Sequence, residues 1–169
     1  FCKGLELVCH FYFNLNWRKQ YVGILKTEYQ GITYYMVDNE FYFGGPSPYD
    51  KIYEDVEKFA YFSKAVLAAL PYMDFVPDII QCNDWQTGLI PVFLKTMYGS
   101  DEFYRNIKTV FAIHNMKFQG RWKINEVVDI TGLPHHIFNS NELESYGEAN
   151  YLKGGIVYAD AVSTVSPTY

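Results

Sequence analysis

The chain has 169 residues, of which 49% are hydrophobic and 20% are charged, and its formal net charge is −5. This length is sufficient for one ordinary domain with a sizeable core, since such a chain buries roughly 70% of its unfolded surface. The negative charge and the lack of a local Lys/Arg cluster exclude nucleic acid as a partner, and no apolar run approaches the roughly 20 residues of a membrane-spanning helix.

The first forty residues are predicted to be extended. Three apolar and aromatic runs, at residues 5–13, 21–25 and 32–37, have the composition of β-strands. Tyr29-Gln30-Gly31, between the second and third runs, is typical of a hairpin turn, and the Gly and Pro residues at 44–48 mark a loop. We therefore expect strands, a turn and a loop before the first long helix.

From Tyr53 the spacing of apolar residues changes to that of an amphipathic helix. Glu54 and Asp55 stand in its expected first turn, where they complement the helix dipole. One face carries apolar and small residues at intervals of three and four: Val56, Phe59, Ala60, Ser63, Val66, Leu67 and Leu70. The helix is predicted to end before Pro71.

Three short apolar runs recur in the rest of the chain, at residues 79–82, 109–113 and 161–165. A helix over residues 87–98, capped by Gly99, is expected after the first run. Ser166-Pro167, an N-cap residue and a Pro at the first helical position, follow the third. Strands separated by helices imply a parallel sheet. The sequence therefore predicts an α/β fold with a doubly wound parallel sheet.

The polar residues directly after these runs are the first candidates for a functional site. Ligands of an open parallel sheet bind outside the carboxyl ends of its strands. These positions hold Asn83-Asp84-Trp85-Gln86, His114-Asn115 and Ser166-Pro167. They offer a carboxylate, an imidazole, amide groups and an aromatic ring, a mixture that suits a multi-hydroxyl ligand. We therefore expect a sugar site, with Asp84 and His114 at one edge of the sheet.

Each of these residues also has a simpler structural interpretation. Asp84 and Ser166 could be N-caps of the helices that follow them. His114 could be a hydrogen-bonded structural residue, as a lone His after a strand commonly is. The residues alone leave these alternatives open.

No metal or cofactor site is expected. His135 and His136 are adjacent and would point apart, with no second ligand three or four residues away. No phosphate-binding Gly motif occurs, and Gly154-Gly155 fits close helix packing better. The three cysteines, Cys2, Cys9 and Cys82, have no CxxC spacing, which fits reduced thiols in the cytoplasm. Cys82 is expected in the core because it lies inside an apolar run.

Four segments carry a resemblance to a known family. They span residues 84–88 (Asp-Trp-Gln-Thr-Gly), 114–120 (His-Asn-Met-Lys-Phe-Gln-Gly), 151–156 (Tyr-Leu-Lys-Gly-Gly-Ile) and 165–169 (Val-Ser-Pro-Thr-Tyr). In order and spacing they are similar to those of bacterial glycogen synthases and plant starch synthases, which form glycosyltransferase family 5. The match extends upstream through residues 17–21, residues 37–40 and the helix from Tyr53, and so covers essentially the whole chain.

The resemblance implies transfer of glucose from ADP-glucose to the non-reducing end of an α-1,4-glucan with retention of configuration. It implies a Rossmann-like domain of the GT-B fold, with no cofactor beyond the donor substrate. His114 would lie against the donor glucose, with its backbone carbonyl near the anomeric carbon and its ring near a sugar hydroxyl. Asp84 would lie beside the acceptor and donor sugars, as a general base or as a hydrogen-bonding anchor.

Two positions depart from the family pattern. Gln86 stands where the motif commonly has His, so proton transfer is not expected there, although its amide can bind a sugar hydroxyl. Residues 44–49 lack the Arg that relatives carry, and only Tyr49 matches a family Tyr placed by the donor site. Together with Asn115, Gln86 and Tyr49 are the expected substrate-binding residues.

The resemblance also implies a domain organisation. The chain begins at Phe1 without Met and stops at Tyr169, directly after a helix-start signal, so both ends are expected to be truncations. Residues 1–169 would be a partial N-terminal domain, without the C-terminal nucleotide-binding domain and inactive alone. Two alternatives remain: another retaining GT-B enzyme, similar to sucrose synthase or to a phosphorylase, or a sugar-binding α/β module without catalysis.

Overall fold

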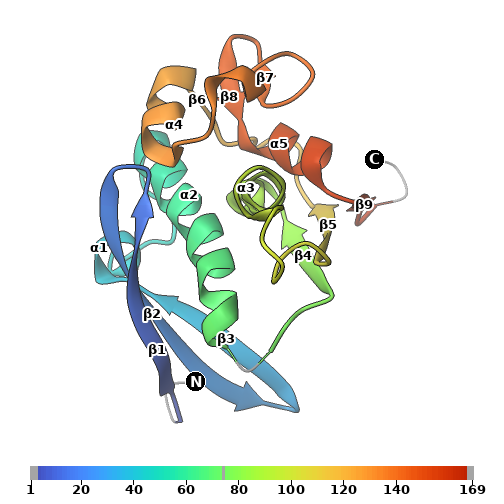
Figure 1. Cartoon of the computed structure of the whole chain (residues 1–169). Helices are drawn as coiled ribbons and strands as arrows, with labels where there is room; N and C mark the ends of the chain where they lie inside the picture. The colour runs from blue at the N-terminus through green and yellow to red at the C-terminus, as the bar shows by residue number, and fades with distance from the viewer. Residues whose placement is uncertain (1–3, 74, 167–169) are drawn as a thin grey trace.

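The N-terminal part is an antiparallel meander of three strands. The computed structural model describes residues 4–73 and 75–166. Strands β1 (Glu6–Leu15), β2 (Arg18–Tyr29) and β3 (Ile32–Asp38) pair in the order β1-β2-β3. They form the lower left of Figure 1. This confirms the extended structure and the turn at Tyr29-Gln30-Gly31, although β1 and β2 are longer than predicted.

A long helix crosses the molecule between the meander and the rest of the chain. After the short helix α1 (Glu40–Phe43), helix α2 runs over Ile52–Ala69, which confirms the predicted amphipathic helix. Its buried face includes Val56, Ala60, Ser63 and Leu67. Pro71 lies in the 3₁₀ turn that ends it.

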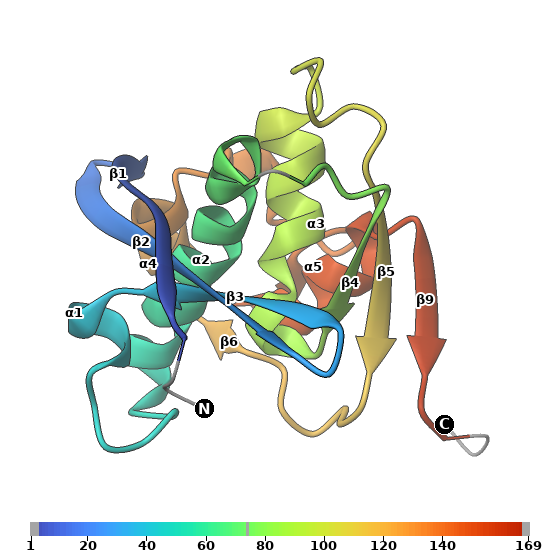
Figure 2. The same ribbon diagram turned by 90° about the horizontal axis from the view of Figure 1, so that it is seen from below.

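The second half of the chain builds a parallel sheet. Strands β4 (Ile79–Asn83), β5 (Lys108–Ile113) and β9 (Ala161–Thr164) pair in the order β4-β5-β9, and Figure 2 shows them pointing the same way. The register pairs Asn83 with Ala112 and Ile113 with Thr164, so all three strands end together. The predicted α/β class with a parallel sheet is confirmed. The helix start predicted at Ser166-Pro167 falls partly outside the described residues.

The segment after β4 differs from the regular helix predicted over residues 87–98. It begins as a 3₁₀ turn at Trp85–Thr87, is α-helical over Leu89–Phe93 (α3), and widens to a π-helical turn over Leu94–Tyr98. In the wide turn the hydroxyl of Thr96 donates to the carbonyl of Val92 at 2.7 Å. This side-chain bond competes for the acceptor that a regular α-turn would use.

Short elements fill the region between β5 and β9, where the sequence predicts a helical segment after the second apolar run but no strands. They are β6 (Arg121–Trp122), α4 (Ile124–Thr131), β7 (Glu144–Ser145), β8 (Glu148–Asn150) and α5 (Tyr151–Tyr158). A Cβ on Gly155 would come within 2.3 Å of the ring of Phe111 in β5. The expectation that the Gly pair permits close helix packing is therefore confirmed.

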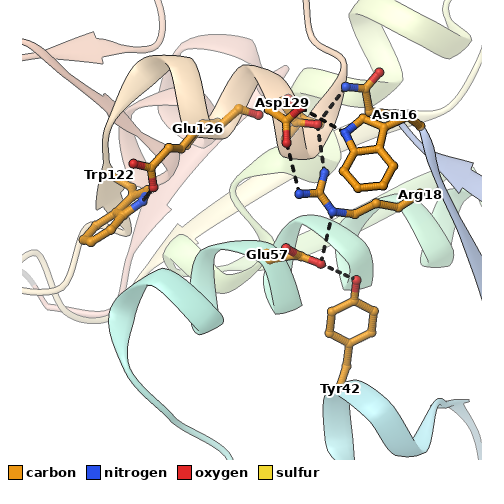
Figure 3. A network of polar contacts seen from close by, with 10 residues as sticks. Asn16, Arg18, Tyr42, Glu57, Trp122, Glu126 and Asp129 are labelled. Atoms are coloured by element: carbon orange, nitrogen blue, oxygen red, sulfur yellow. Dashed lines mark hydrogen bonds and ion pairs between the residues drawn. The ribbon is translucent and has the colours of Figure 1, made fainter.

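A polar network fixes the meander to the helices (Figure 3). The guanidinium of Arg18, at the start of β2, pairs with Asp129 of α4 at 3.0 Å and with Glu57 of α2 at 3.6 Å. The hydroxyl of Tyr42 donates to the same Glu57 carboxylate at 2.8 Å, and Asn16 donates to the backbone carbonyl of Asp129 at 2.7 Å. These contacts hold α1 and α2 in place, and thus both ends of the loop at residues 44–51.

The start of β9 is anchored to β5 through Asp160. Its carboxylate pairs with Lys95 at 2.8 Å and accepts the backbone N–H of Thr109, also at 2.8 Å. Burial acts to raise the pKa of Asp160, but the bonds from Lys95 and Thr109 outweigh it and lower the pKa to about 2. Asp160 therefore stabilises the fold in its charged form.

Replacing Asp160 by Asn should lower the free energy of unfolding by about 1–2 kcal/mol near neutral pH. The difference should persist above the unfolded-state pKa of about 3.9 and shrink as the pH falls towards about 2, because protonation of Asp160 in the folded wild type then removes its charged contacts. Chemical denaturation of both proteins across this range checks it. A difference that stays constant down to the lowest pH would show that the charge of Asp160 contributes nothing.

None of the described helices is long and apolar enough to cross a membrane. Cys82 is fully buried in the core, as predicted, and Cys9 is half-buried; neither forms a disulfide among the described residues.

Candidate active site

Asp84 and His114 lie together at the carboxyl edge of the parallel sheet. One carboxylate oxygen of Asp84, Oδ1, accepts the backbone N–H of His114 at 2.7 Å and that of Asn115 at 3.1 Å. The N–H of Asp84 in turn donates to the carbonyl of Ala112 in β5 at 3.0 Å. The predicted meeting of Asp84 and His114 at one edge is confirmed, and it follows from the parallel register of β4 and β5.

Asp84 does not cap the helix that follows it. It precedes the 3₁₀ turn at Trp85–Thr87, but its side chain makes no capping bond there. Its backbone has φ 56° and ψ −174°, a conformation that residues with a β-carbon rarely adopt. The N-cap interpretation is therefore wrong, and the strained backbone instead turns the carboxylate across to β5. Such strain persists where the surrounding structure enforces it, commonly at functional sites.

The ring of His114 is exposed beyond the sheet and is tethered at one nitrogen. Its Nε2 lies 3.1 Å from Oδ1 of Asn83, the last residue of β4. The same oxygen of Asn83 accepts the side-chain amide of Gln81 at 3.3 Å. The ring is therefore hydrogen-bonded, as expected for a structural His. It is also exposed, so a ligand could still reach it.

Thr87 was not among the predicted site residues, yet it fixes the turn that carries Asp84. Its single hydroxyl proton lies between the carbonyls of Asn83 and Asp84, at O···O distances of 2.9 and 3.2 Å, and its oxygen accepts the N–H of Asn83 at 2.6 Å. The signal for it was available: a Thr placed three or four residues after these carbonyls can reach back to them.

Asn115 begins a loop that returns to the core. Its side-chain oxygen accepts the N–H of Lys117 at 3.0 Å. Further along, the side chain of Gln119 accepts from the amide of Asn150 at 2.7 Å, and the N–H of Leu152 donates to the carbonyl of Gln119 at 3.1 Å. The loop is thus tied to the start of α5.

Gln86 and Tyr49, predicted as substrate-binding residues on separate segments, are in contact. The Gln86 amide donates to the Tyr49 hydroxyl at 3.0 Å. Tyr49 belongs to the loop between α1 and α2. The ammonium of the buried Lys58 binds this loop, because it contacts the Asp50 carboxylate and lies 3.4 Å from the Pro48 carbonyl. The three segments that carry Tyr49, Asp84-Gln86 and His114-Asn115 are thus joined into one surface.

The remaining candidates are Ser166 and the adjacent histidines. Ser166 follows β9, and its N–H donates to the hydroxyl of Thr164 at 3.4 Å; the residues after it are not described. His135 and His136 belong to a separate 3₁₀ turn. In the described part of the chain no group of three His, Cys, Asp or Glu residues could hold a metal ion.

Gly120 closes the loop against the ring of Trp85. It has φ +60°, and a Cβ there would lie 2.2 Å from Cε3 of Trp85. Gly120→Ala should therefore lower the free energy of unfolding by about 2–4 kcal/mol, through overpacking and an unfavourable backbone. Urea denaturation checks this against Gly31→Ala, a matched control with φ +76° and no atom near its Cβ. Equal losses in the two variants would show that Trp85 does not confine the loop.

Comparison with known proteins decides the family. The family model for the starch synthase catalytic domain matches residues 2–169. The chain belongs to this family. Over 160 residues it is 62% identical to a glycogen synthase of Lachnospira eligens, covering 95% of the chain and 34% of that relative. A glycogen synthase of Bacillus cereus is 46% identical over 155 residues, covering 92% of the chain and 32% of the relative.

A solved structure from the starch synthase family has the same fold. The catalytic domain of starch synthase IV from Arabidopsis thaliana, bound to ADP and acarbose, superposes with a TM-score of 0.86 at 25% sequence identity. The match covers 98% of this chain and 35% of that one. The chain therefore spans about a third of the length of the curated relatives and of the solved domain.

Proposed function

We propose that the protein of which this chain is part transfers glucose from ADP-glucose to the non-reducing end of an α-1,4-glucan, with retention of configuration. The observation that carries the proposal is the strand-end arrangement, in which Asp84 holds the backbone of His114 and Asn115. Membership of the starch synthase catalytic domain family supports the reaction class. Identity of 62% to a glycogen synthase supports a glucan product.

The two carboxylate oxygens of Asp84 would have different roles. Oδ1 is occupied by two backbone N–H groups, and among the described residues Oδ2 makes no hydrogen bond or ion pair. A sugar hydroxyl can therefore bind Oδ2 while Oδ1 keeps the loop in place. Either role that the sequence leaves open for Asp84, hydrogen-bonding anchor or general base, would use this free oxygen.

His114 would act on the donor sugar from two directions. Its backbone carbonyl would lie near the anomeric carbon and stabilise the positive charge that develops as the bond to the nucleotide breaks. Its ring, held by Asn83, would bind a sugar hydroxyl. Asn115, Gln86 and Tyr49 would bind the rest of the sugars; because Gln86 and Tyr49 are already bonded to each other, they would do so as a pair.

The proposed partners are the donor, the glucan and a second domain of the same polypeptide. Residues 1–169 would be part of an N-terminal Rossmann-like domain, and a second domain of the same polypeptide would bind the nucleotide. The length of the relatives supports this, because they extend far beyond the region that this chain matches. We place the protein in the cytoplasm, where thiols such as Cys9 and Cys82 stay reduced.

Offering three donors to the full-length protein tests the proposal. With glycogen as acceptor, ADP-glucose should support glucose incorporation, and UDP-glucose or glucose 1-phosphate should support much less. Preference for glucose 1-phosphate would assign the protein to the phosphorylase-like alternative. Glycogen binding with no incorporation from any donor would favour a sugar-binding module without catalysis.

A further inference from the structure

Side chains on one face of the parallel sheet form a row that ends at His114. Residues two apart on a strand point to the same face, so Gln81 and Asn83 share one face of β4. Asn83 pairs in register with Ala112 of β5, and His114 follows Ala112 by two residues. Because the side chain of Ala112 is only a methyl group, it leaves room for the Asn83 side chain to reach the His114 ring.

Two contacts converge on the side-chain oxygen of Asn83. Nε2 of His114 lies 3.1 Å from Oδ1 of Asn83, and the side-chain amide of Gln81 donates to the same Oδ1 at 3.3 Å. An amide oxygen has two lone pairs and no proton, so it can accept from both groups and donate to neither. The hydrogen bond to His114 therefore requires the proton of the neutral ring to be on Nε2.

The other ring nitrogen of His114 is left for a ligand. Among the described residues Nδ1 makes no hydrogen bond, and the side chain is exposed. In a neutral imidazole with its proton on Nε2, Nδ1 has a free lone pair and accepts a hydrogen bond. It therefore suits a hydroxyl group, which has a proton to donate, better than a carbonyl or an ionised phosphate oxygen, which can only accept.

We propose that Asn83 is a positioning residue for glucosyl transfer: it keeps the proton of the neutral His114 ring on Nε2, so that Nδ1 accepts a hydrogen bond from a hydroxyl of the donor glucose. The inference rests on the proposed function, which supplies the sugar at this ring. Asn83 would not touch the sugar, and its contribution would pass through His114. Gln81 would hold the Asn83 oxygen in place.

The side chain of Asn83 can be changed without removing the contacts that hold the turn at Asp84. The bonds between Thr87 and Asn83 use only the backbone N–H and carbonyl of Asn83. Pairing of β4 with β5 also uses backbone groups. Leu has the branched shape of Asn but no polar atom, so Asn83→Leu removes the acceptor and keeps these backbone bonds.

A double-mutant cycle tests whether Asn83 acts through His114. In the full-length protein, Asn83→Leu should lower kcat/KM for ADP-glucose about three- to tenfold, the range expected for loss of one hydrogen bond. The KM for glycogen should stay unchanged. In a protein that already carries His114→Ala, the same substitution should have no further effect, because the ring is gone. Equal losses with and without the His114 ring would overturn the proposal.

Asn14→Leu is a matched control for the cycle. It introduces the same side chain at another exposed Asn, in β1, where the Asn side chain makes no hydrogen bond among the described residues. This variant should change neither kcat/KM for ADP-glucose nor the KM for glycogen. A loss equal to that of Asn83→Leu would show that an exposed Leu, and not the missing acceptor, lowers activity, and would overturn the proposal.

Nitrogen NMR of the full-length protein with isotope-labelled histidine locates the proton directly. At about pH 8, where an ordinary imidazole is neutral, the His114 ring should carry its proton on Nε2, and Asn83→Leu should admit the other form. The spectrum of His114→Ala identifies the signals. A wild-type ring protonated on Nδ1 would overturn the proposal. A wild-type protein without transferase activity would instead contradict the proposed function, and the spectrum would still decide the position of the proton.

Discussion

Alanine at Asp84 or at His114 is expected to lower turnover of the full-length protein several hundredfold, equivalent to about 3–4 kcal/mol of transition-state stabilisation. Asp84→Ala removes the acceptor of two N–H groups, so the backbone of His114 and Asn115 loses its fixed position. It also removes the oxygen proposed to bind the sugar. His114→Ala keeps the backbone carbonyl but removes the ring that Asn83 holds. Initial rates with saturating ADP-glucose and glycogen provide the measurement.

Two further variants separate catalysis from folding. Asp84→Asn keeps an oxygen that can accept the two N–H groups but loses the charge, so a smaller loss than in Asp84→Ala would identify loop positioning as the main role. Asp101→Ala removes a carboxylate that binds one backbone N–H, of Phe103, in a turn outside the site. It should reduce stability slightly and leave turnover intact. Near-normal turnover in both Asp84→Ala and His114→Ala would mean that these residues serve only the fold.

The 169-residue chain by itself should incorporate no glucose into glycogen, even when folded. Retaining transfer of this kind needs the donor enclosed, water excluded and the leaving diphosphate neutralised. The site proposed here would supply only the sugar-facing wall, and the relatives are about three times as long as the region matched. Loss of the groups that neutralise the diphosphate should alone cost several kcal/mol, and each 1.36 kcal/mol is about tenfold in rate.

Incubation of the purified chain with ADP-[14C]glucose and glycogen checks this expectation. Label in the precipitated glycogen should not exceed a protein-free blank, and the full-length protein under the same conditions should incorporate label readily. Circular dichroism of the chain under the assay conditions should be recorded as a control for folding. Clear incorporation by the chain would show that residues 1–169 contain the whole catalytic apparatus and that a second domain is not needed.

The position of the candidate site was predictable from the sequence because the parallel strands are short and sharply bounded. Asp84 and His114 follow β4 and β5 directly, and the parallel register brings the two strand ends together. The nature of their contact was not predictable. It depends on the positive φ of Asp84, and nothing in an Asp-Trp pair announces that backbone conformation.

Contacts across long sequence separations were also beyond the reach of local patterns. Gln86 and Tyr49 are 37 residues apart, and their bond exists because α2 and the loop before it are fixed by Arg18 and Lys58. The β7–β8 hairpin was missed because strands of two and three residues show no alternation. Its one signal was the Gly147 that follows Tyr146 at the turn.

The most direct test of the proposed site is a crystal structure of the full-length protein with ADP and acarbose, the ligands of the related Arabidopsis domain. We expect a sugar ring over the carboxyl ends of β4 and β5, with a hydroxyl hydrogen-bonded to Oδ2 of Asp84 and the ring next to the backbone carbonyl of His114. Acarbose bound with no contact to either residue would contradict the assignment of this strand edge as the site of glucosyl transfer.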